Sequence, residues 1–248
     1  MSAYKKRVIL HCTIRLSTIY MTIEPLYASE SQQSSTLADR VCHEIITAIV
    51  KGEIPAGAKI SEPELAKTYG ISRGPLREAI RRLEGLRLVE RKPHIGARVV
   101  QLSVKELLEI YRVREALEGM ACRLAAIVMS QEEINQLRTL LDQHQSGIEE
   151  QEGQAYFQKE GDLDFHYRIV MASGNSKLQE LLAADLYHLV RMYRYQFSLS
   201  SSRPTMALRE HHQILDAIEA RDEELAELLM RRHISASRRN IESKLNQS

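Results

Sequence analysis

The sequence predicts a mostly α-helical protein made of two units, a small N-terminal unit at residues 36–102 and an all-α helical bundle at residues 103–248. Two observations support this fold class. Apolar residues recur at spacings of three and four through almost the whole second unit, which is the pattern of packed amphipathic helices. The first unit combines three short helical patterns with two short strands around a turn, which is typical of a winged helix-turn-helix.

The two units differ in charge. Residues 36–102 carry 12 Lys and Arg against 8 Asp and Glu, whereas residues 103–248 carry 18 against 23. A basic unit joined to an acidic one is typical of a nucleic-acid-binding domain attached to a second domain with another task. The excess of positive charge is modest, so it agrees with DNA binding without establishing it.

Residues 1–35 are predicted to be a disordered leader, and Met21 remains open as an alternative start of translation. The basic start and the apolar run after it resemble a signal peptide, but His11 and Arg15 interrupt that run. No stretch approaches the roughly 18 apolar residues of a membrane helix. The three cysteines are widely spaced and form no Cys-x-x-Cys pair, which fits a reducing cytosol. We therefore expect a cytoplasmic protein without a membrane partner.

Three helices and a β-hairpin are expected in the N-terminal unit. Apolar side chains recur every fourth residue across 37–49, and a second short helix is expected at 63–69. Ser72 stands at the N-cap position of a third helix that reaches residue 83, and Pro75 in its first turn removes no helical hydrogen bond. Residues 88–91 and 97–100 are expected to be strands, with residues 92–96 forming the wing between them.

Arginines gather on the third helix, outside its apolar stripe. Arg73 and Arg77 lie one turn apart near its N-terminus, and Arg81 and Arg82 follow further along. In a helix-turn-helix protein that end of the recognition helix meets base edges in the major groove. A guanidinium group can hold O6 and N7 of guanine together. The alternative is that these arginines form an ordinary solvated face.

The run Gly70-Ile-Ser-Arg-Gly-Pro-Leu-Arg-Glu-Ala-Ile-Arg-Arg-Leu83 resembles the winged helix of GntR-type bacterial transcription regulators, and the flanking residues Ile54-Pro-Ala-Gly57, Leu65-Ala66 and Gly96 match as well. The resemblance implies that Arg73 and Arg77 contact bases or adjacent phosphates. It also implies that Ser72 and Pro75 fix the helix start and that Gly96 lets the wing approach the minor groove. The sequence departs from the family pattern at three positions: Gly74 replaces the usual threonine, Arg87 stands where a turn glycine is common, and Ile95 replaces a frequent wing arginine.

Four side chains of the C-terminal unit fit the ligand set of a divalent metal. Asp162 and His166 lie four residues apart in a helical stretch, so both occupy one face, one turn apart. His211 and His233 fall in later helical segments. Three imidazoles and one carboxylate suit zinc, nickel, manganese or iron and leave coordination positions open. Surface or satisfied core histidines are the alternative.

Residues 103–248 resemble the FCD effector domain of the FadR branch of GntR regulators. The matching motifs are Asp162-x-x-Phe-His166, Ser173-Gly-Asn175, Glu210-His211-x-x-Ile-Leu-x-Ala-Ile218 and Met230-Arg-x-His233. In metal-binding members an Asp and three His hold one cation, and the register places His211, not His212, at the ligand position. Arg114 matches the residue that pairs with an effector carboxylate. An ordinary helical ion pair between Arg114 and Glu118 is the alternative.

The function implied is a ligand-responsive transcription regulator that binds palindromic double-stranded operator DNA as a homodimer and responds to a small carboxylic acid. A metal-dependent hydrolase is a second possibility, because open His/Asp sites also activate water. No general base accompanies the four ligands in motif form, and no nucleophile elbow or phosphate loop is present, so no enzyme activity is predicted. A direct metal sensor and a purely structural metal remain open.

Overall fold

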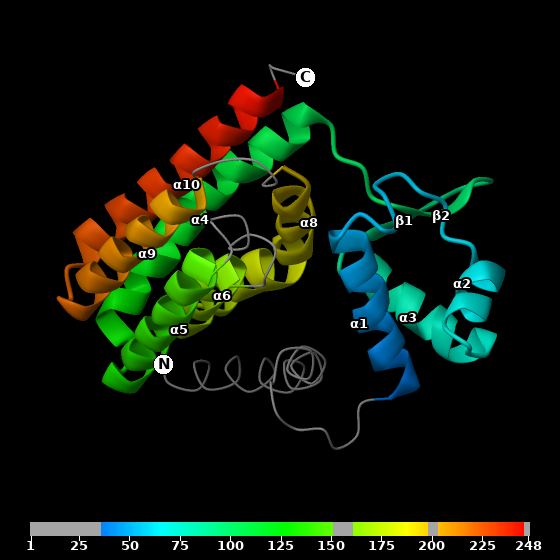
Figure 1. Cartoon of the computed structure of the whole chain (residues 1–248), viewed down its shortest axis with the longest axis horizontal. Coiled ribbons are helices and arrows are strands. Elements are labelled where there is room, and N and C mark those ends of the chain that lie inside the picture. The colour runs from blue at the N-terminus through cyan, green and yellow to red at the C-terminus, as the bar shows by residue number, and fades with distance from the viewer. Residues whose placement is uncertain (1–35, 151–160, 198–202, 246–248) are drawn as a thin grey trace, which may run out of the picture.

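The computed structural model describes residues 36–150, 161–197 and 203–245. The predicted disordered leader at residues 1–35 lies outside the described residues. Within them the chain forms a small N-terminal domain beside a larger bundle of helices, as Figure 1 shows. The predicted fold class, a winged helix-turn-helix followed by an all-helical unit, is confirmed.

The N-terminal domain follows the predicted order of elements closely. These elements are α1 (Leu37–Val50), α2 (Glu62–Thr68), α3 (Arg73–Gly85), β1 (Val89–Lys92) and β2 (Gly96–Val99). The two strands pair in antiparallel register, with Val89 opposite Val99 and Lys92 opposite Gly96. The helices begin and end within two residues of their expected positions, because caps and turn glycines mark those ends in the sequence itself.

Helix α1 begins at a capping box. The Thr36 hydroxyl accepts from the backbone N–H of Asp39 at 3.2 Å, and the Asp39 carboxylate accepts from the backbone N–H of Thr36 at 2.8 Å. The Asp39 carboxylate also pairs with Arg82 of α3. One carboxylate therefore both caps the start of α1 and links α1 to α3.

The turn after α3 explains one departure from the family pattern. Arg87 has a φ of +55°, in the left-handed region where glycine carries no steric penalty. A residue with a side chain can adopt this conformation only at a cost in free energy. The position therefore keeps the backbone that the family's glycine favours, although an arginine occupies it.

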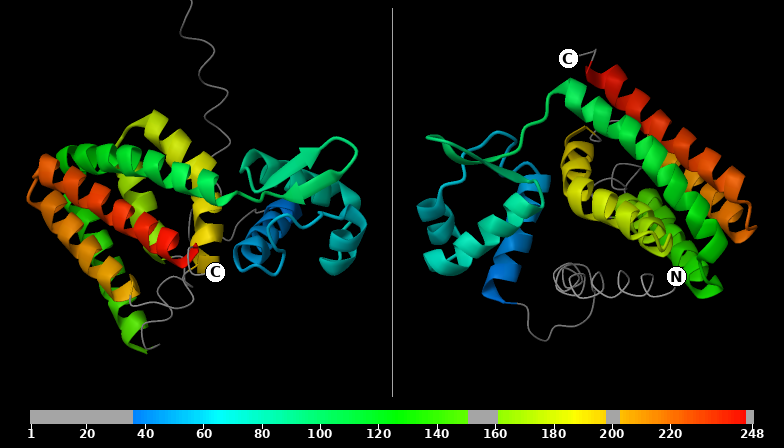
Figure 2. Two further views of the ribbon diagram at one scale, coloured as in Figure 1. Left: turned by 90° about the horizontal axis from the view of Figure 1, so that it is seen from above. Right: turned by 180° about the vertical axis from the view of Figure 1, so that it is seen from behind.

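The C-terminal bundle is made of α4 (Val104–Val128), α5 (Gln131–Glu150), α6 (Gly161–Ala172), α7 (Ser176–Leu178), the π-helix η2 (Gln179–Leu186), α8 (Tyr187–Phe197), α9 (Arg203–Glu219) and α10 (Glu223–Leu245). The two long helices α4 and α10 lie side by side, as both views in Figure 2 show. Between α7 and α8, the eight residues of η2 adopt the wider π geometry.

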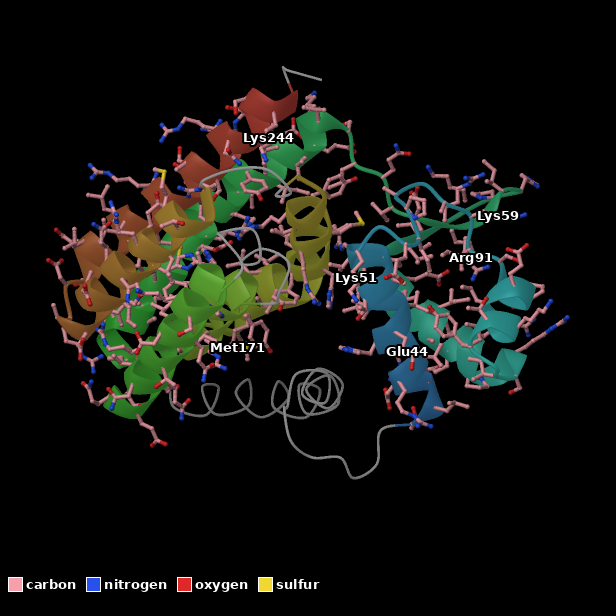
Figure 3. All side chains as sticks on the ribbon, in the orientation of Figure 1. Glu44, Lys51, Lys59, Arg91, Met171 and Lys244 are labelled. Atoms are coloured by element: carbon pink, nitrogen blue, oxygen red, sulfur yellow. The ribbon has the colours of Figure 1, made fainter. Side chains whose placement is uncertain are left out.

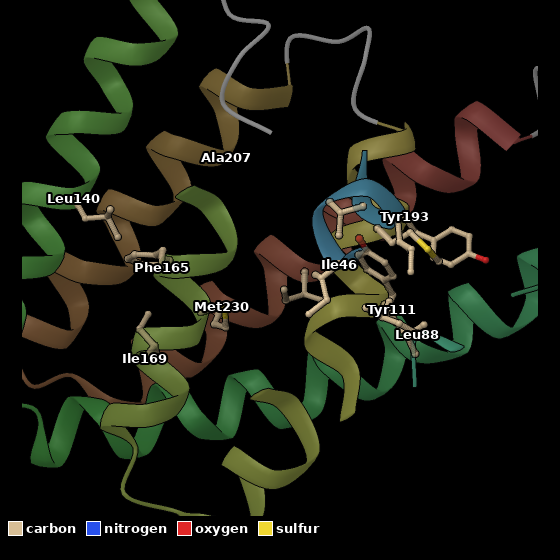
Figure 4. Close-up of a cluster of buried hydrophobic side chains, with 14 of the residues drawn as sticks. Ile46, Leu88, Tyr111, Leu140, Phe165, Ile169, Tyr193, Ala207 and Met230 are labelled. Carbon is tan, nitrogen blue, oxygen red and sulfur yellow. The ribbon is translucent and has the colours of Figure 1, made fainter. Parts of the chain in front are cut away.

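One hydrophobic core runs through both domains. It extends from Ile46 of α1 and Leu88 after α3 to Tyr111 of α4 and Tyr193 of α8, and Figure 4 shows part of it. Helix α1 packs against α8, and the Tyr193 hydroxyl accepts from the backbone N–H of Leu102 at 2.5 Å in the segment that joins the domains. The N-terminal domain therefore packs directly on the bundle. In the described ranges, no helix is long and apolar enough to cross a membrane.

Candidate metal centre and DNA-binding surface

The N-terminal end of α3 presents the predicted DNA-binding residues to solvent. Ser72, Arg73 and Arg77 are all exposed, and the Arg77 side chain is 59% accessible. Ser72 has the extended backbone of an N-cap residue, but its hydroxyl makes no capping hydrogen bond within the described residues. Ser72 and Pro75 thus open the helix through backbone conformation. Ser72 is the N-cap residue of α3, the position that the sequence predicts.

The arginines of α3 have different partners. Arg77 Nε donates to Glu62 Oε2 of α2 at 2.9 Å, and both side chains remain accessible. Arg82 pairs with Asp39 and with Glu78, so it joins helices rather than facing a ligand. Arg81 is more accessible, at 73%. Of these three side chains, Arg77 and Arg81 are accessible enough to contact DNA, whereas Arg82 stabilises the packing of the helices.

The wing lies between β1 and β2, at the end of the molecule away from the bundle. Gly96 has a φ of +89°, a conformation that side chains rarely adopt, and Ile95 beside it is 48% exposed. Lys59 and Arg91 project from the same end of the domain, as Figure 3 shows. The wing therefore offers a backbone that can approach DNA closely, together with nearby cations.

Three of the four predicted metal ligands converge inside the bundle. His166 of α6, His211 of α9 and His233 of α10 are buried, and their ligand atoms lie within 4.8 Å of one another. Nε2 of His233 lies 3.2 Å from Nε2 of His166 and 3.2 Å from Nε2 of His211. Ligands about 2.1 Å from a shared ion, as in zinc sites, are separated by about this distance. The side chain of the fourth predicted ligand, Asp162, lies outside the described residues; the backbone of α6 carries it one turn before His166.

A buried carboxylate orients His166. His166 Nδ1 lies 2.5 Å from Glu118 Oε2, and Glu118 Oε1 accepts from Arg114 Nε at 2.6 Å. Burial alone would raise the pKa of the Glu118 carboxyl, but Arg114 and His166 outweigh it and lower that pKa to about 2. Glu118 is therefore a charged acceptor, and Nδ1 of His166 carries the proton that it accepts.

A second carboxylate does the same for His233. His233 Nδ1 lies 2.6 Å from Glu210 Oε2. The Arg203 guanidinium donates hydrogen bonds to both carboxylate oxygens of Glu210, at 2.8 and 2.7 Å. Arg203 also donates to the backbone carbonyl of His233 at 3.2 Å. This arrangement matches the carboxylate–histidine pairs that fix the tautomer and ring orientation of metal ligands.

The geometry of the imidazoles calls for a cation between them. With Nδ1 protonated, Nε2 of His166 and of His233 holds a lone pair in the neutral ring, and two lone pairs at 3.2 Å repel each other. Burial, followed by nearby cationic groups, keeps the pKa of His211 and of His233 well below the usual value, so both rings favour the neutral form. A single shared proton could bridge only two of the three nitrogens. A metal ion would satisfy all three, so the residues fit a divalent metal.

A cavity opens beside His166. It measures about 330 Å³ including its open mouth. Its lining side chains are Arg114, Glu118, His166, Tyr167, Val170, Leu182, Ala183, Leu186, Tyr187 and Val190. Arg114 is buried and paired with Glu118, as the alternative interpretation of this residue expected, yet its Nη1 has no hydrogen-bond partner among the described residues. Arg114 therefore combines the ion pair with one unpartnered donor, on a residue that lines the cavity.

Replacing Glu118 with glutamine should weaken metal binding by 10- to 100-fold, because loss of a partner that orients a ligand typically has an effect of this size. A glutamine side chain is neutral and has only one oxygen, so it cannot accept hydrogen bonds from both His166 and Arg114 as the Glu118 carboxylate does. Competition with a chromogenic chelator would measure the affinity. Glu109→Gln, an exposed position on the same helix, is the matched control. Equal affinities for the two variants would show that Glu118 does not act on the site.

The sequence motifs did not identify every residue of the site. Glu118 entered only as a rival partner for Arg114, and Glu210 only as the residue before His211. Arg203 gave no signal, because it lies seven residues before Glu210 and 30 before His233 and meets them only in the folded bundle. The i, i+4 spacing of Arg114 and Glu118 was the one clue within reach of the sequence.

Comparison with known proteins agrees with both domains. Residues 37–99 match the family model "Bacterial regulatory proteins, gntR family", and residues 109–236 match the FCD domain. The chain is 33% identical over 217 residues to a probable D-xylose utilization operon transcriptional repressor of Paenarthrobacter nicotinovorans, covering 82% of this chain and 87% of the relative. It is 30% identical to the transcriptional repressor RspR of Escherichia coli (strain K12), covering 75% and 80%.

Among solved structures, E. coli McbR/YncC has a similar fold, with a TM-score of 0.70 and 21% identity over 86% of this chain and 100% of that one. This likeness concerns the fold alone. The family assignment rests on the two domain matches and on the curated relatives, which are regulators and not enzymes. The chain therefore belongs to the GntR family of bacterial transcription regulators and carries a C-terminal FCD domain.

Proposed function

We propose that this regulator is a homodimeric repressor that binds a palindromic operator and responds to a small carboxylic acid held at a divalent metal site. One observation carries the proposal. Three buried imidazole nitrogens converge at a point next to a cavity that also contains a buried arginine with a spare donor. A site with an ion and a guanidinium group at one cavity suits a carboxylate ligand.

The metal would be held by His166, His211 and His233, with Asp162 as the fourth ligand. Such a donor set suits zinc, nickel, manganese or iron. When bound, the ion would supply open coordination positions for a carboxylate oxygen. Arg114 would donate from Nη1 to the same carboxylate, while Glu118 and Glu210 keep the imidazoles in the ligating tautomer.

Operator recognition would come from Arg73 and Arg77 at the major groove and from the wing at Gly96. Exposure of the two arginines supports this role, and Arg77 would first leave Glu62. An exposed ion pair of this kind contributes only about 0–1 kcal/mol, so DNA can displace it easily. Repression is proposed because relatives at 33% and 30% identity are described as repressors.

An apolar stripe on α4 supports the homodimer. Val113, Met120 and Ile127 follow one another at seven-residue intervals and are 49%, 42% and 57% exposed. Seven residues are close to two helical turns, so the three side chains share a face. A second copy of this chain presenting the same stripe would bury it in a symmetric contact.

Met120→Glu should convert the dimer to a monomer, because it places two like charges at the centre of a symmetric apolar contact. Light scattering coupled to size-exclusion chromatography would measure the mass. Met171→Glu, at an equally exposed methionine on α6, is the control. A Met120→Glu protein that stays dimeric would place the interface elsewhere.

A titration separates the proposed function from its nearest alternatives. Fluorescence anisotropy of a labelled fragment from the protein's own promoter region would follow DNA binding while metal and organic acids are added separately. A response to acid only in the metal-loaded protein supports the proposal. A response to metal alone identifies a direct metal sensor. If neither metal nor organic acid changes operator binding, the metal has only a structural role.

A further inference from the structure

We infer that the effector is a short monocarboxylic acid with an apolar body, and not a hydroxylated sugar acid or a dicarboxylate. This inference rests on the proposed function, because it names the chemical class that the same cavity would accept. The inference comes from the cavity wall, where the charged groups form one cluster and the remaining lining residues are mostly apolar.

All the charged groups of the wall belong to one connected cluster. Arg114 donates to Glu118 at 2.6 Å, and Glu118 lies 2.5 Å from Nδ1 of His166. The Glu118 carboxylate is thus engaged on both oxygens, which leaves Arg114 Nη1 as the unpartnered donor of this cluster among the described residues. One guanidinium donor beside one metal position suits a single carboxylate. A second carboxylate would need another cation, and the described lining residues offer none.

The rest of the wall is apolar. Val170 lies one turn after His166, and Leu182, Ala183, Leu186 and Val190 come from η2 and α8. None of these side chains can donate or accept a hydrogen bond. Beyond the charged cluster, the two tyrosine hydroxyls are the only such groups among the described lining residues. A sugar acid carries a hydroxyl on nearly every carbon. Most of those hydroxyls would lose water without gaining a partner, which strongly disfavours binding.

Packing around the cavity gives a second, independent reason. Two small groups of buried side chains stand apart from the main core in the described chain. One contains Val170 and Leu182, and the other contains Tyr187 and Val190. Leu186 packs against both groups, and all five residues line the cavity. An apolar ligand body between the groups would contact both and complete their packing, whereas a polar body would not.

The π-helix shapes this wall. Three of the lining side chains, Leu182, Ala183 and Leu186, lie in η2. A π-helix is wider than an α-helix, and such segments occur frequently at functional sites. The volume of about 330 Å³ includes open solvent at the mouth, so it is an upper limit on the space for a ligand, and the acid must be short.

Calorimetric titration of the metal-loaded full-length protein with two six-carbon acids tests the inference. 4-Methylpentanoate should bind at least tenfold more tightly than gluconate, and 4-methylpentanamide, which lacks the charge, should bind at least tenfold more weakly than 4-methylpentanoate. Leu182→Asn should lower the affinity for 4-methylpentanoate by at least tenfold without weakening gluconate. Leu181→Asn, on the exposed side of the same π-helix, should change neither.

The outcomes separate this inference from the proposed function. Tighter binding of gluconate, or of a six-carbon dicarboxylate such as adipate, overturns the apolar class while a carboxylate effector survives. If metal-loaded protein binds no acid at all, both proposals fail. A Leu182→Asn protein that binds 4-methylpentanoate as tightly as the Leu181→Asn control also overturns the inference, because the ligand then lies elsewhere.

Discussion

Replacement of His211 by alanine should strip the metal from the protein and lower its thermal stability. His211 supplies one of three imidazole nitrogens, and its Nε2 lies 3.2 Å from that of His233. A ligand bound only by the folded state adds about 4 kcal/mol when its concentration is a thousand times its dissociation constant. For a chain of this length, that loss corresponds to a fall of roughly 10 °C in the unfolding midpoint. Elemental analysis and calorimetric melting would measure both effects.

The matched control is His212→Ala, which removes the neighbouring imidazole on α9 that lies outside the cluster. Loss of the His211 ring also removes its stacking on Phe165, at 4.3 Å between centroids, so some destabilisation is independent of metal. A chelator distinguishes the two effects. It should lower the midpoint of the wild type and of His212→Ala while leaving His211→Ala unchanged. If the wild-type protein holds no metal after native purification, and none after reconstitution, the proposed metal site is ruled out.

Replacement of Arg77 by alanine should abolish discrimination between operator and unrelated DNA. A bidentate contact from arginine to guanine is worth about 1–3 kcal/mol, and a symmetric dimer makes it twice. The combined loss of about 2–6 kcal/mol corresponds to a fall of roughly 30- to 20,000-fold in operator affinity. Fluorescence anisotropy with operator and scrambled fragments would measure it.

Arg81→Ala serves as the comparison for Arg77. Arg81 is exposed and lies one turn further from the start of α3, so it should contact phosphates and not bases. Its loss should weaken binding to both fragments equally and reduce the dependence of affinity on salt. Arg82→Ala makes a poor comparison, because Arg82 joins α1 to α3 and its loss disturbs the fold. If Arg77→Ala still prefers the operator, another residue of the helix or the wing must recognise the bases.

The fold of the N-terminal domain was largely predictable because its signals are local. The four-residue apolar spacing of α1, the N-cap position at Ser72 and the turn before Gly96 each lie within a few residues of the structure they cause. The convergence of three histidines was predictable for another reason. A family motif assigns His166, His211 and His233 together, although they lie on three helices far apart in the chain, and the structure brings these three imidazoles together.

What the sequence determined by itself was therefore the fold class, the regulator family and the type of each candidate ligand. Only the tertiary structure decided which carboxylate orients which imidazole, that Arg82 holds the fold together, and that Arg203 reaches Glu210 and His233. It also decided that residues 179–186 widen into a π-helix beside an apolar cavity. These features depend on contacts between different helices. The residues that make such contacts are separated by irregular distances along the sequence, so no periodic pattern reveals them. A pattern read along one helix shows which face is buried, but not which partner meets it.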